Sequence, residues 1–304
     1  MLAQDGGLRT KQARIRRPMV GFEAGVDDFA EQDRLLERMR TAALGAGALA
    51  LEFFRSGERT RAAIEYKSGG SPVTEADFAV DRFLERELWP SAPASGWLSE
   101  EKADDLQRLD RRRVFIVDPI DGTRAFVRGD PRWAVSIALV VDGAPAVAVL
   151  HLPALDRTYA AIRGGGATLN GRRIAVSSHP SLDQARAAGP GFLLQALQRA
   201  GAAISPQAKV PSLALRIAQV ASAEFDLGLA STDAHDWDIA AADLILHEAG
   251  GVLCDVSGEA PRYNAREPRH GVLVAVPRQL KRETIAAMRT LELGSASTKP
   301  APHS

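Results

Sequence analysis

Val114-Phe-Ile-Val-Asp-Pro-Ile-Asp-Gly-Thr-Arg124 is the stretch from which the rest of the chain can be interpreted. Its four apolar and mostly β-branched residues predict a buried strand. We expect that strand to end at Asp118, because Pro119 cannot donate a hydrogen bond to a neighbouring strand. Asp121 and a glycine then precede a short segment that is compatible with a helix. The stretch therefore predicts a strand end with two carboxylates beside the start of a helix.

Such an arrangement suits one kind of chemistry in particular. Carboxylate oxygens are good ligands for hard cations such as Mg²⁺, and free N–H groups at a helix start can hold a phosphate. A site with both features fits metal-assisted chemistry on a phosphate ester. Asp, Pro and Gly are also common in surface turns, so the stretch taken alone leaves that simpler interpretation open.

The composition is that of an ordinary globular protein, with 304 residues, of which 45% are hydrophobic and 25% charged. The 38 basic and 38 acidic residues balance, so nothing suggests attraction to nucleic acid or an anionic membrane. No apolar stretch reaches the ~18 residues that would predict a membrane span. The lone Cys254 cannot form an intrachain disulfide and is interpreted as a core residue. Without a secretory signal pattern, the expected location is the cytoplasm.

The first half of the chain predicts a pair of helices followed by a run of strands. The helices are expected over 33–54 and 78–88, and the strands over 62–66, 114–117, 133–141, 146–152 and 158–162. Asn170-Gly171 is typical of a tight turn and predicts a hairpin between 167–169 and 174–176. This order favours an α+β layer over a doubly wound sheet.

The second half alternates between helices and strands. We predict helices over 192–200, 213–223, 239–249 and 279–291, and strands over 225–229, 252–256 and 271–276. Residues 177–190 are expected to join the two parts. The predicted organisation is a disordered basic tail (1–25), an N-terminal α+β domain (26–180), a C-terminal α/β domain that carries Asp238 (181–292) and a disordered tail (293–304).

Three further elements place acidic residues at defined positions. Thr74 and Asp77 have the spacing of a capping box at a helix start. Glu100 and Glu101 follow a short apolar pair and on their own are typical of a solvated loop. Asp238 lies in the first turn of an apolar helix, where it would complement the helix dipole.

Together with the strand end at 114–124, these elements resemble the inositol monophosphatase family of Mg²⁺-dependent, lithium-sensitive phosphatases. The resemblance extends from about Asp28 to Leu291. It implies a two-domain α-β-α-β-α layered sandwich with the site in the cleft between the domains. It also implies two or three Mg²⁺ ions and a small-molecule phosphate ester as substrate. A homodimer is common in this family, but no interface is recognisable in the sequence.

The resemblance also implies a role for each matching residue. The implied metal ligands are Glu100, Asp118, Asp121, Asp238 and the backbone carbonyl of Ile120. The implied substrate-binding residues are Asp121, Gly122, Thr123 and Asp238, with the N–H groups of Gly122 and Thr123 holding the phosphate. Thr123 and Glu100 would orient the attacking water. Asp77 would pair with Thr123 or with a third metal ion. Asp233, His235 and Asp236 just before Asp238 could meet the leaving group, although a solvated loop is the preferred interpretation.

Two features bear on the substrate. Ser231 stands seven residues before Asp238, where inositol-specific members carry a glutamate. The segment Lys67 to Asp77 is similar to the nucleotidase branch of the family. We therefore expect a 3'(2'),5'-bisphosphate nucleotidase that converts 3'-phosphoadenosine 5'-phosphate to AMP and phosphate. Inositol 1-phosphate and then histidinol phosphate are the alternative substrates. A non-catalytic relative that binds metal or phosphate is the alternative of another class.

Overall fold

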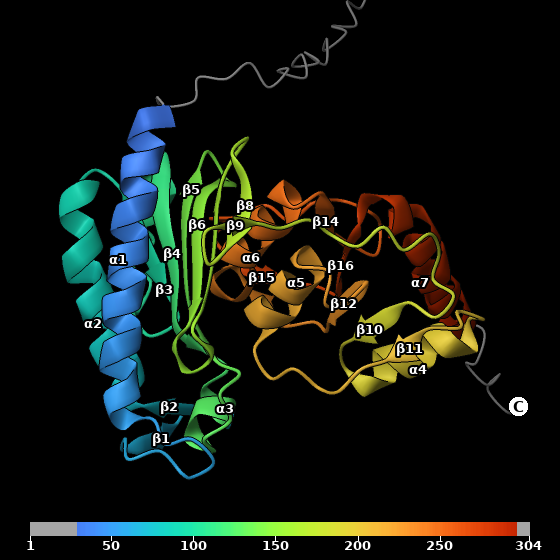
Figure 1. Ribbon diagram of the computed structural model, residues 1–304, viewed down its shortest axis with the longest axis horizontal. Coiled ribbons are helices and arrows are strands. Elements are labelled where there is room, and N and C mark those ends of the chain that lie inside the picture. Colours follow the sequence, from blue (N-terminus) through green and yellow to red (C-terminus); the bar gives the residue numbers. More distant parts are fainter. Residues whose placement is uncertain (1–28, 297–304) are drawn as a thin grey trace, which may run out of the picture.

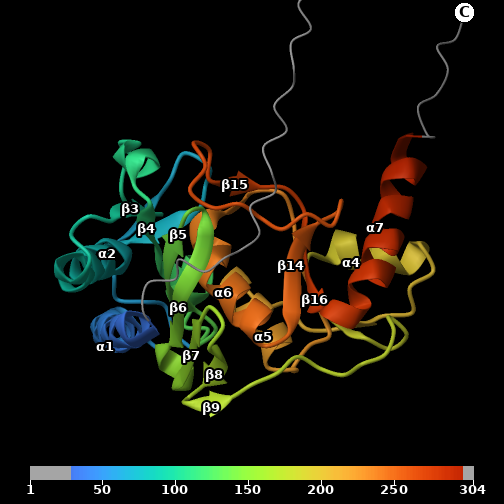
Figure 2. The ribbon, with the colours of Figure 1, turned by 90° about the horizontal axis from the view of Figure 1, so that it is seen from above.

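The computed structural model describes residues 29–296 and arranges them as alternating layers of helix and sheet (Figure 1). The layers follow one another as a helix pair, a seven-stranded sheet, a second helix pair, a five-stranded sheet and a third helix pair. Figure 2 shows the two outer pairs, α1 with α2 and α4 with α7, on opposite sides of the molecule. The predicted α-β-α-β-α sandwich is therefore confirmed. The predicted tail 1–25 and residues 297–304 lie outside the described residues.

The first helix pair consists of α1 (Phe29–Phe53) and α2 (Glu75–Leu88). Small residues of α1, including Ala43, Ala46 and Ala50, are fully buried, which lets its backbone lie close to its neighbours. Together with Val80 and Leu84 of α2 they form one core cluster with the near face of the seven-stranded sheet.

The seven-stranded sheet has the order β3-β4-β5-β6-β7-β8-β9, and only β3 and β4 run parallel. Its strands are β3 (Gly96–Ser99), β4 (Arg113–Asp121), β5 (Ala134–Val141), β6 (Ala144–Leu152), β7 (Arg157–Ile162), β8 (Gly166–Leu169) and β9 (Arg172–Arg173). Helices cover both faces, so β5 and β6 are apolar and buried along almost their whole length.

The central pair, α5 (Leu213–Ala221) and α6 (Asp236–Glu248), lies between the two sheets. Most residues of α6 from Ile239 to Leu246 are buried, as expected for a helix that is apolar all round. The core cluster around α6 contains residues of both sheets, such as Ile116 from β4 and Ala275 from the second sheet.

The five-stranded sheet has the order β11-β10-β12-β16-β14. Its strands are β10 (Arg186–Ala188), β11 (Ser205–Pro206), β12 (Leu227–Ala230), β14 (Gly251–Asp255) and β16 (Leu273–Pro277). Its outer face packs on α4 (Gly191–Arg199) and α7 (Lys281–Ala296). None of the helices within 29–296 combines the length and the apolar character needed to cross a membrane.

Short elements complete the fold near the ends of the strands. They are β1 (Ile64–Tyr66), β2 (Pro72–Thr74), the short helix α3 (Thr123–Val127), β13 (Ala234–His235) and β15 (Arg269–His270). β1 pairs with β2, and β13 pairs with β15, in both cases antiparallel.

The predicted end of the central strand at Asp118 is wrong. β4 continues to Asp121 because a bulge between Asp118 and Asp121 takes up Pro119, and the pairing with β5 resumes at Ala134. A bulge is one of the few places where a sheet tolerates proline.

Several other predicted bounds differ from the structure. β9 is limited to Arg172–Arg173, and the segment 174–176 instead leads toward the end of α6, where Val176 N donates to Ala249 O at 3.0 Å. The segment 177–190 was expected as a joint but contains β10. The four-residue strand β3 was not predicted because so short a segment shows no alternation. α7 continues to Ala296, so residues 293–296 belong to a helix and not to a tail. The domain boundary near 180 stays a prediction.

The backbone at Gly129 generates a test of the packing around α3. Gly129 has a φ of +74°, and an added Cβ would lie 2.3 Å from the carbonyl oxygen of Arg55 and 2.5 Å from the amide nitrogen of Glu58. Backbone atoms cannot yield as a flexible side chain can. We expect Gly129→Ala to lower the free energy of unfolding by about 3 kcal/mol, from left-handed strain and overpacking together. Urea unfolding measures this change.

Gly171→Ala is the matched control. Gly171 has a similar φ of +76°, but no heavy atom lies within 4 Å of the added Cβ. Gly171→Ala should therefore lower the free energy of unfolding only by the cost of a left-handed backbone, about 1 kcal/mol. Equal losses in the two variants would contradict the role given to the close approach at Gly129.

Candidate active site

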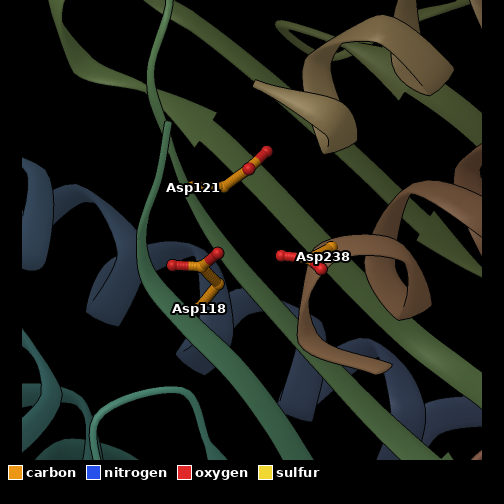
Figure 3. A group of neighbouring side chains, drawn as sticks. All are labelled: Asp118, Asp121 and Asp238. Atoms are coloured by element: carbon orange, nitrogen blue, oxygen red, sulfur yellow. The ribbon is translucent and has the colours of Figure 1, made fainter. Parts of the chain in front are cut away.

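Three carboxylates from distant parts of the sequence converge beside the end of β4. Each of Asp118, Asp121 and Asp238 offers an oxygen, and these oxygens lie within 4.8 Å of one another. Figure 3 shows the three side chains as neighbours, with Asp118 and Asp121 on the end of β4 and Asp238 at the start of α6. Asp118 and Asp121 are 1% and 5% exposed. We call these three residues the carboxylate cluster.

The bulge and the turn that follows it set the direction of the first two carboxylates. The backbone N–H of Ile120 donates to Asp118 Oδ1 at 2.9 Å, and the Ile120 side chain is fully buried, which anchors the turn. Gly122 then reverses the chain with a φ of +96°, a left-handed value that a side chain would strain. Helix α3 begins at the next residue, Thr123. The predicted helix start beside two carboxylates is therefore present.

Asp121 also holds the start of α5. Its carboxylate accepts hydrogen bonds from Ser212 Oγ and from the backbone N–H groups of Ala214, at 2.8 Å, and Leu213, at 3.3 Å. Ser212 is fully buried and caps the helix, because its Oγ accepts from Leu215 N at 3.0 Å. Ser212 was not among the predicted site residues. A serine immediately before an apolar helical run is the signal that could have identified it.

Asp238 lies in the first turn of α6, as predicted, and accepts a hydrogen bond from the backbone N–H of His235 at 2.7 Å. The His235 ring stacks on Trp237 with 4.6 Å between ring centres. The interpretation of this segment as a solvated loop is wrong for Asp236, which is fully buried. Its carboxylate lies 2.7 Å from His270 Nε2 and accepts from Asn264 N.

Glu100 and Glu101 follow β3, which pairs with β4 in parallel and so brings both acids toward the carboxylate cluster. Lys67 Nζ lies 2.8 Å from Glu100 Oε1 and 2.9 Å from Glu101 Oε1. Glu100 lines a cavity of about 330 Å³ together with all three cluster residues. Burial, and after it the charge of Glu100, raises the pKa of Glu101 to about 7.

Asp77 makes both of the contacts that the sequence suggested. Thr74 donates to Asp77 Oδ2 through its backbone N–H, at 2.8 Å, and through its hydroxyl, at 2.6 Å, which completes the capping box of α2. The other oxygen of Asp77 lies 3.3 Å from the Thr123 hydroxyl, which also lies 3.1 Å from the carbonyl oxygen of Ile120. Asp77 thus connects α2 with the turn after β4.

The buried carboxylates raise one another's pKa. Burial is the largest cause for each, and it raises the pKa of Asp77 and of Asp121 to about 6. Asp118 and Asp238 are raised well above the usual range, by burial first and then by neighbouring carboxylates. Among the described residues, no arginine or lysine forms an ion pair with any member of the carboxylate cluster. Three convergent carboxylate oxygens without an ion-pair partner fit a divalent cation with oxygen ligands.

Comparison with known proteins gives consistent matches over most of the chain. The model of the inositol monophosphatase family matches residues 35–293. An inositol-1-monophosphatase of Rhizobium meliloti is 35% identical over an alignment of 234 residues that covers 74% of this chain and 86% of that protein. A histidinol-phosphatase of Mycobacterium tuberculosis is 36% identical over an alignment of 224 residues that covers 69% of this chain and 84% of that protein. A solved IMPase structure from Thermotoga maritima has a TM-score of 0.74 at 29% identity and covers 86% of this chain and 99% of that one.

The raised pKa values predict how the stability of the metal-free protein depends on pH. In the folded protein Asp77 and Asp121 have a pKa of about 6, compared with an ordinary value of 3.8. Between pH 3.8 and pH 6 the folded state therefore binds more protons than the unfolded state. Stability is therefore gained as the pH falls through about 6 and lost as it rises. We expect the melting temperature in EDTA to be roughly 5 °C higher at pH 5 than at pH 7.5.

Bound Mg²⁺ should remove this difference by compensating the carboxylates, and should raise the melting temperature at pH 7.5. Scanning calorimetry at the two pH values, with EDTA and with excess Mg²⁺, makes the comparison. An unchanged pH dependence in Mg²⁺ would show that the ion does not bind at the carboxylate cluster.

Proposed function

The chain belongs to the inositol monophosphatase family and is a Mg²⁺-dependent phosphatase, and from this premise we propose that it hydrolyses a 3'(2'),5'-bisphosphate nucleotide. The substrate proposed is 3'-phosphoadenosine 5'-phosphate, with AMP and phosphate as products. The observation that carries the phosphatase site is the convergence of Asp118, Asp121 and Asp238 beside a helix start. A cytoplasmic location and a homodimer stay predictions.

The acidic residues fit two or three Mg²⁺ ions. The proposed ligands are Glu100, Asp118, the Ile120 carbonyl, Asp121 and Asp238. Bound there, Mg²⁺ would lower the pKa of a water molecule and stabilise negative charge on the leaving oxygen of the ester. The chain itself fixes the ligands, because Asp118 and Asp121 are held by backbone N–H groups and are almost fully buried.

Thr123 and Glu100 are proposed to orient the attacking water. One oxygen of Asp77 is fixed by two hydrogen bonds from Thr74, and the other lies beside the Thr123 hydroxyl and limits its orientation. As the first residues of a helix, Gly122 and Thr123 have N–H groups without partners in the helix. These groups are proposed to hold the phosphate.

The substrate proposal rests on Ser231 and on the volume of the cleft that it lines. Ser231 lines a cleft of about 960 Å³ that also contains Asp121 and Asp238. Serine has neither the charge nor the reach of the glutamate that inositol-specific members carry at this position. Inositol 1-phosphate and histidinol phosphate are the alternative substrates, because relatives are named inositol-1-monophosphatase and histidinol-phosphatase. A non-catalytic role would not explain why several acidic residues are grouped around Thr123.

Phosphate release from three esters tests the substrate. With Mg²⁺ present, we expect kcat/KM for 3'-phosphoadenosine 5'-phosphate to exceed that for inositol 1-phosphate and for histidinol phosphate by at least about tenfold, a discrimination that one extra polar contact provides. Preference for inositol 1-phosphate would overturn the argument from Ser231. Release from none of the three, with folded protein, would favour the non-catalytic alternative.

A substitution in the carboxylate cluster tests the site. Asp118→Asn should lower kcat by about a thousandfold, as expected for loss of a charge that acts on the transition state. It should not lower the melting temperature of the metal-free protein, because it removes a buried charge that its neighbours repel.

Asp243→Asn is the control on α6. Asp243 is also a carboxylate whose burial raises its pKa to about 6, but it accepts a hydrogen bond from the Tyr263 hydroxyl at 2.7 Å and does not line either cavity of the site. It should keep kcat within about twofold. Similar losses in both variants would mean that buried charge in general, and not the carboxylate cluster, controls turnover.

A further inference from the structure

A large part of the cleft beside the carboxylate cluster has no role in the chemistry described above. The cleft has a volume of about 960 Å³ and begins at Asp121 and Asp238. From there it extends along the start of α5 to the segment Gly189–Gly191, where α4 begins. A single phosphate held at Thr123 would leave this extension empty, and the charges of its walls indicate which ligand group it favours.

Arg216 of α5 is the unusual residue in this wall. It is only 8% exposed, and its guanidinium donates to two backbone carbonyls, Leu229 O at 2.7 Å and Val210 O at 2.8 Å. Its Nε has no hydrogen-bond partner, and among residues 29–296 no carboxylate forms an ion pair with it. Neutral carbonyls satisfy the terminal N–H groups, and the carboxylate charge that acts on Arg216 is that of Asp121, at the metal end of the cleft, without an ion pair between them. A buried charge normally has a closer partner.

Other groups add to the positive character of the extension. Lys209 is exposed in the cleft, and Arg124 reaches it from α3. The first turn of α4 faces the same space without a side-chain cap at Pro190, so its free N–H groups and the positive end of the helix dipole are available.

The acidic groups of the cleft do not cancel this charge. Asp121 and Asp238 lie at the end where the metal is expected, and they would be compensated there. Asp233 is exposed and already pairs with Arg269. The part of the cleft between α4 and α5 is therefore cationic, with Arg216 and Lys209 as its charged side chains.

We propose that this cationic extension, formed by Arg216, Lys209 and the start of α4, is the subsite for a second phosphate group on the substrate. The inference rests on the proposed function, since it assumes that the first phosphate is hydrolysed at the carboxylate cluster. The subsite selects phosphate monoesters that carry a further phosphate. Inositol 1-phosphate offers only neutral hydroxyl groups to it, and histidinol phosphate offers an ammonium group that it would repel.

Two nucleotides that differ by one phosphate make the test. Adenosine 3',5'-bisphosphate and adenosine 3'-monophosphate present the same ester to the carboxylate cluster, but only the first has a 5'-phosphate for the subsite. With the full chain and Mg²⁺, we expect the ratio of their kcat/KM values to be about 100 in favour of the bisphosphate, the range for two charge-assisted contacts.

Lys209→Gln, at an exposed position, should lower this ratio about tenfold, mainly by raising KM for the bisphosphate. Arg216→Gln should lower it as well, and Lys209→Gln alone decides the test if Arg216→Gln does not fold. Arg199→Gln, an exposed arginine at the far end of α4, is the control and should leave the ratio unchanged. A ratio near one in the unsubstituted protein, or equal losses for both nucleotides in Lys209→Gln, would overturn the subsite while the phosphatase assignment stands.

Calorimetric titration with AMP separates failure of the subsite from failure of the proposed function. AMP keeps the second phosphate and should bind at least about tenfold more tightly than adenosine, with that advantage reduced in Lys209→Gln. This pattern without any turnover would overturn the proposed function and support the subsite. AMP that binds no better than adenosine would overturn the subsite.

Discussion

The repulsion among buried carboxylates at the end of β4 is the constraint on which the site depends. Asp118, Asp121 and Asp238 lie within 4.8 Å of one another with almost no access to water around the first two. A folded chain holds such charges together only if other interactions are strong enough to oppose the repulsion. Here the bulge in β4, the capped start of α5 and the first turn of α6 supply them. Each of these also presents a backbone N–H to one carboxylate. The positions of the carboxylates are thus fixed by the backbone and not by the ions that would bind there.

The layered fold was largely predictable because long helices and long strands carry strong periodic signals. The helices α1 and α6 and the strands β5 and β6 were all recognised from their apolar patterns. Short segments were not: β3 has four residues and β10 has three, and such lengths show no period. The conformation of such segments is decided by pairing with a neighbouring strand. The same holds at Pro119, which cannot donate a backbone hydrogen bond, because β4 pairs with β5 on both sides of it.

Asp77, Asp118 and Asp121 were recognisable because they stand at element boundaries that the sequence marks with a capping threonine, a proline or a glycine. Glu100 and Asp238 were identified only through the family resemblance. The partners of the acidic residues were harder to find. Ser212 lies 91 residues from Asp121 and was recognisable only as a helix cap. Arg216 looked like an ordinary charged residue in a helix, because sequence alone does not reveal that its guanidinium is enclosed and bound only to carbonyl oxygens. Both residues take part in contacts between segments that are separate in the sequence. A local sequence pattern does not predict such contacts.

The helix α6 has a consequence for how the protein folds. Its apolar surface packs on both sheets at once, and a single core cluster includes residues from β4, α5, α6 and β16. Neither half of the chain can enclose this helix alone, since each would leave one of its faces in water. The two sheets therefore belong to one cooperative folding unit. During synthesis, the chain would have to emerge beyond β16 before the first sheet gained its full stability. A gene fragment that ends between the sheets would encode a sheet with one unprotected apolar face, which is the kind of surface that aggregates.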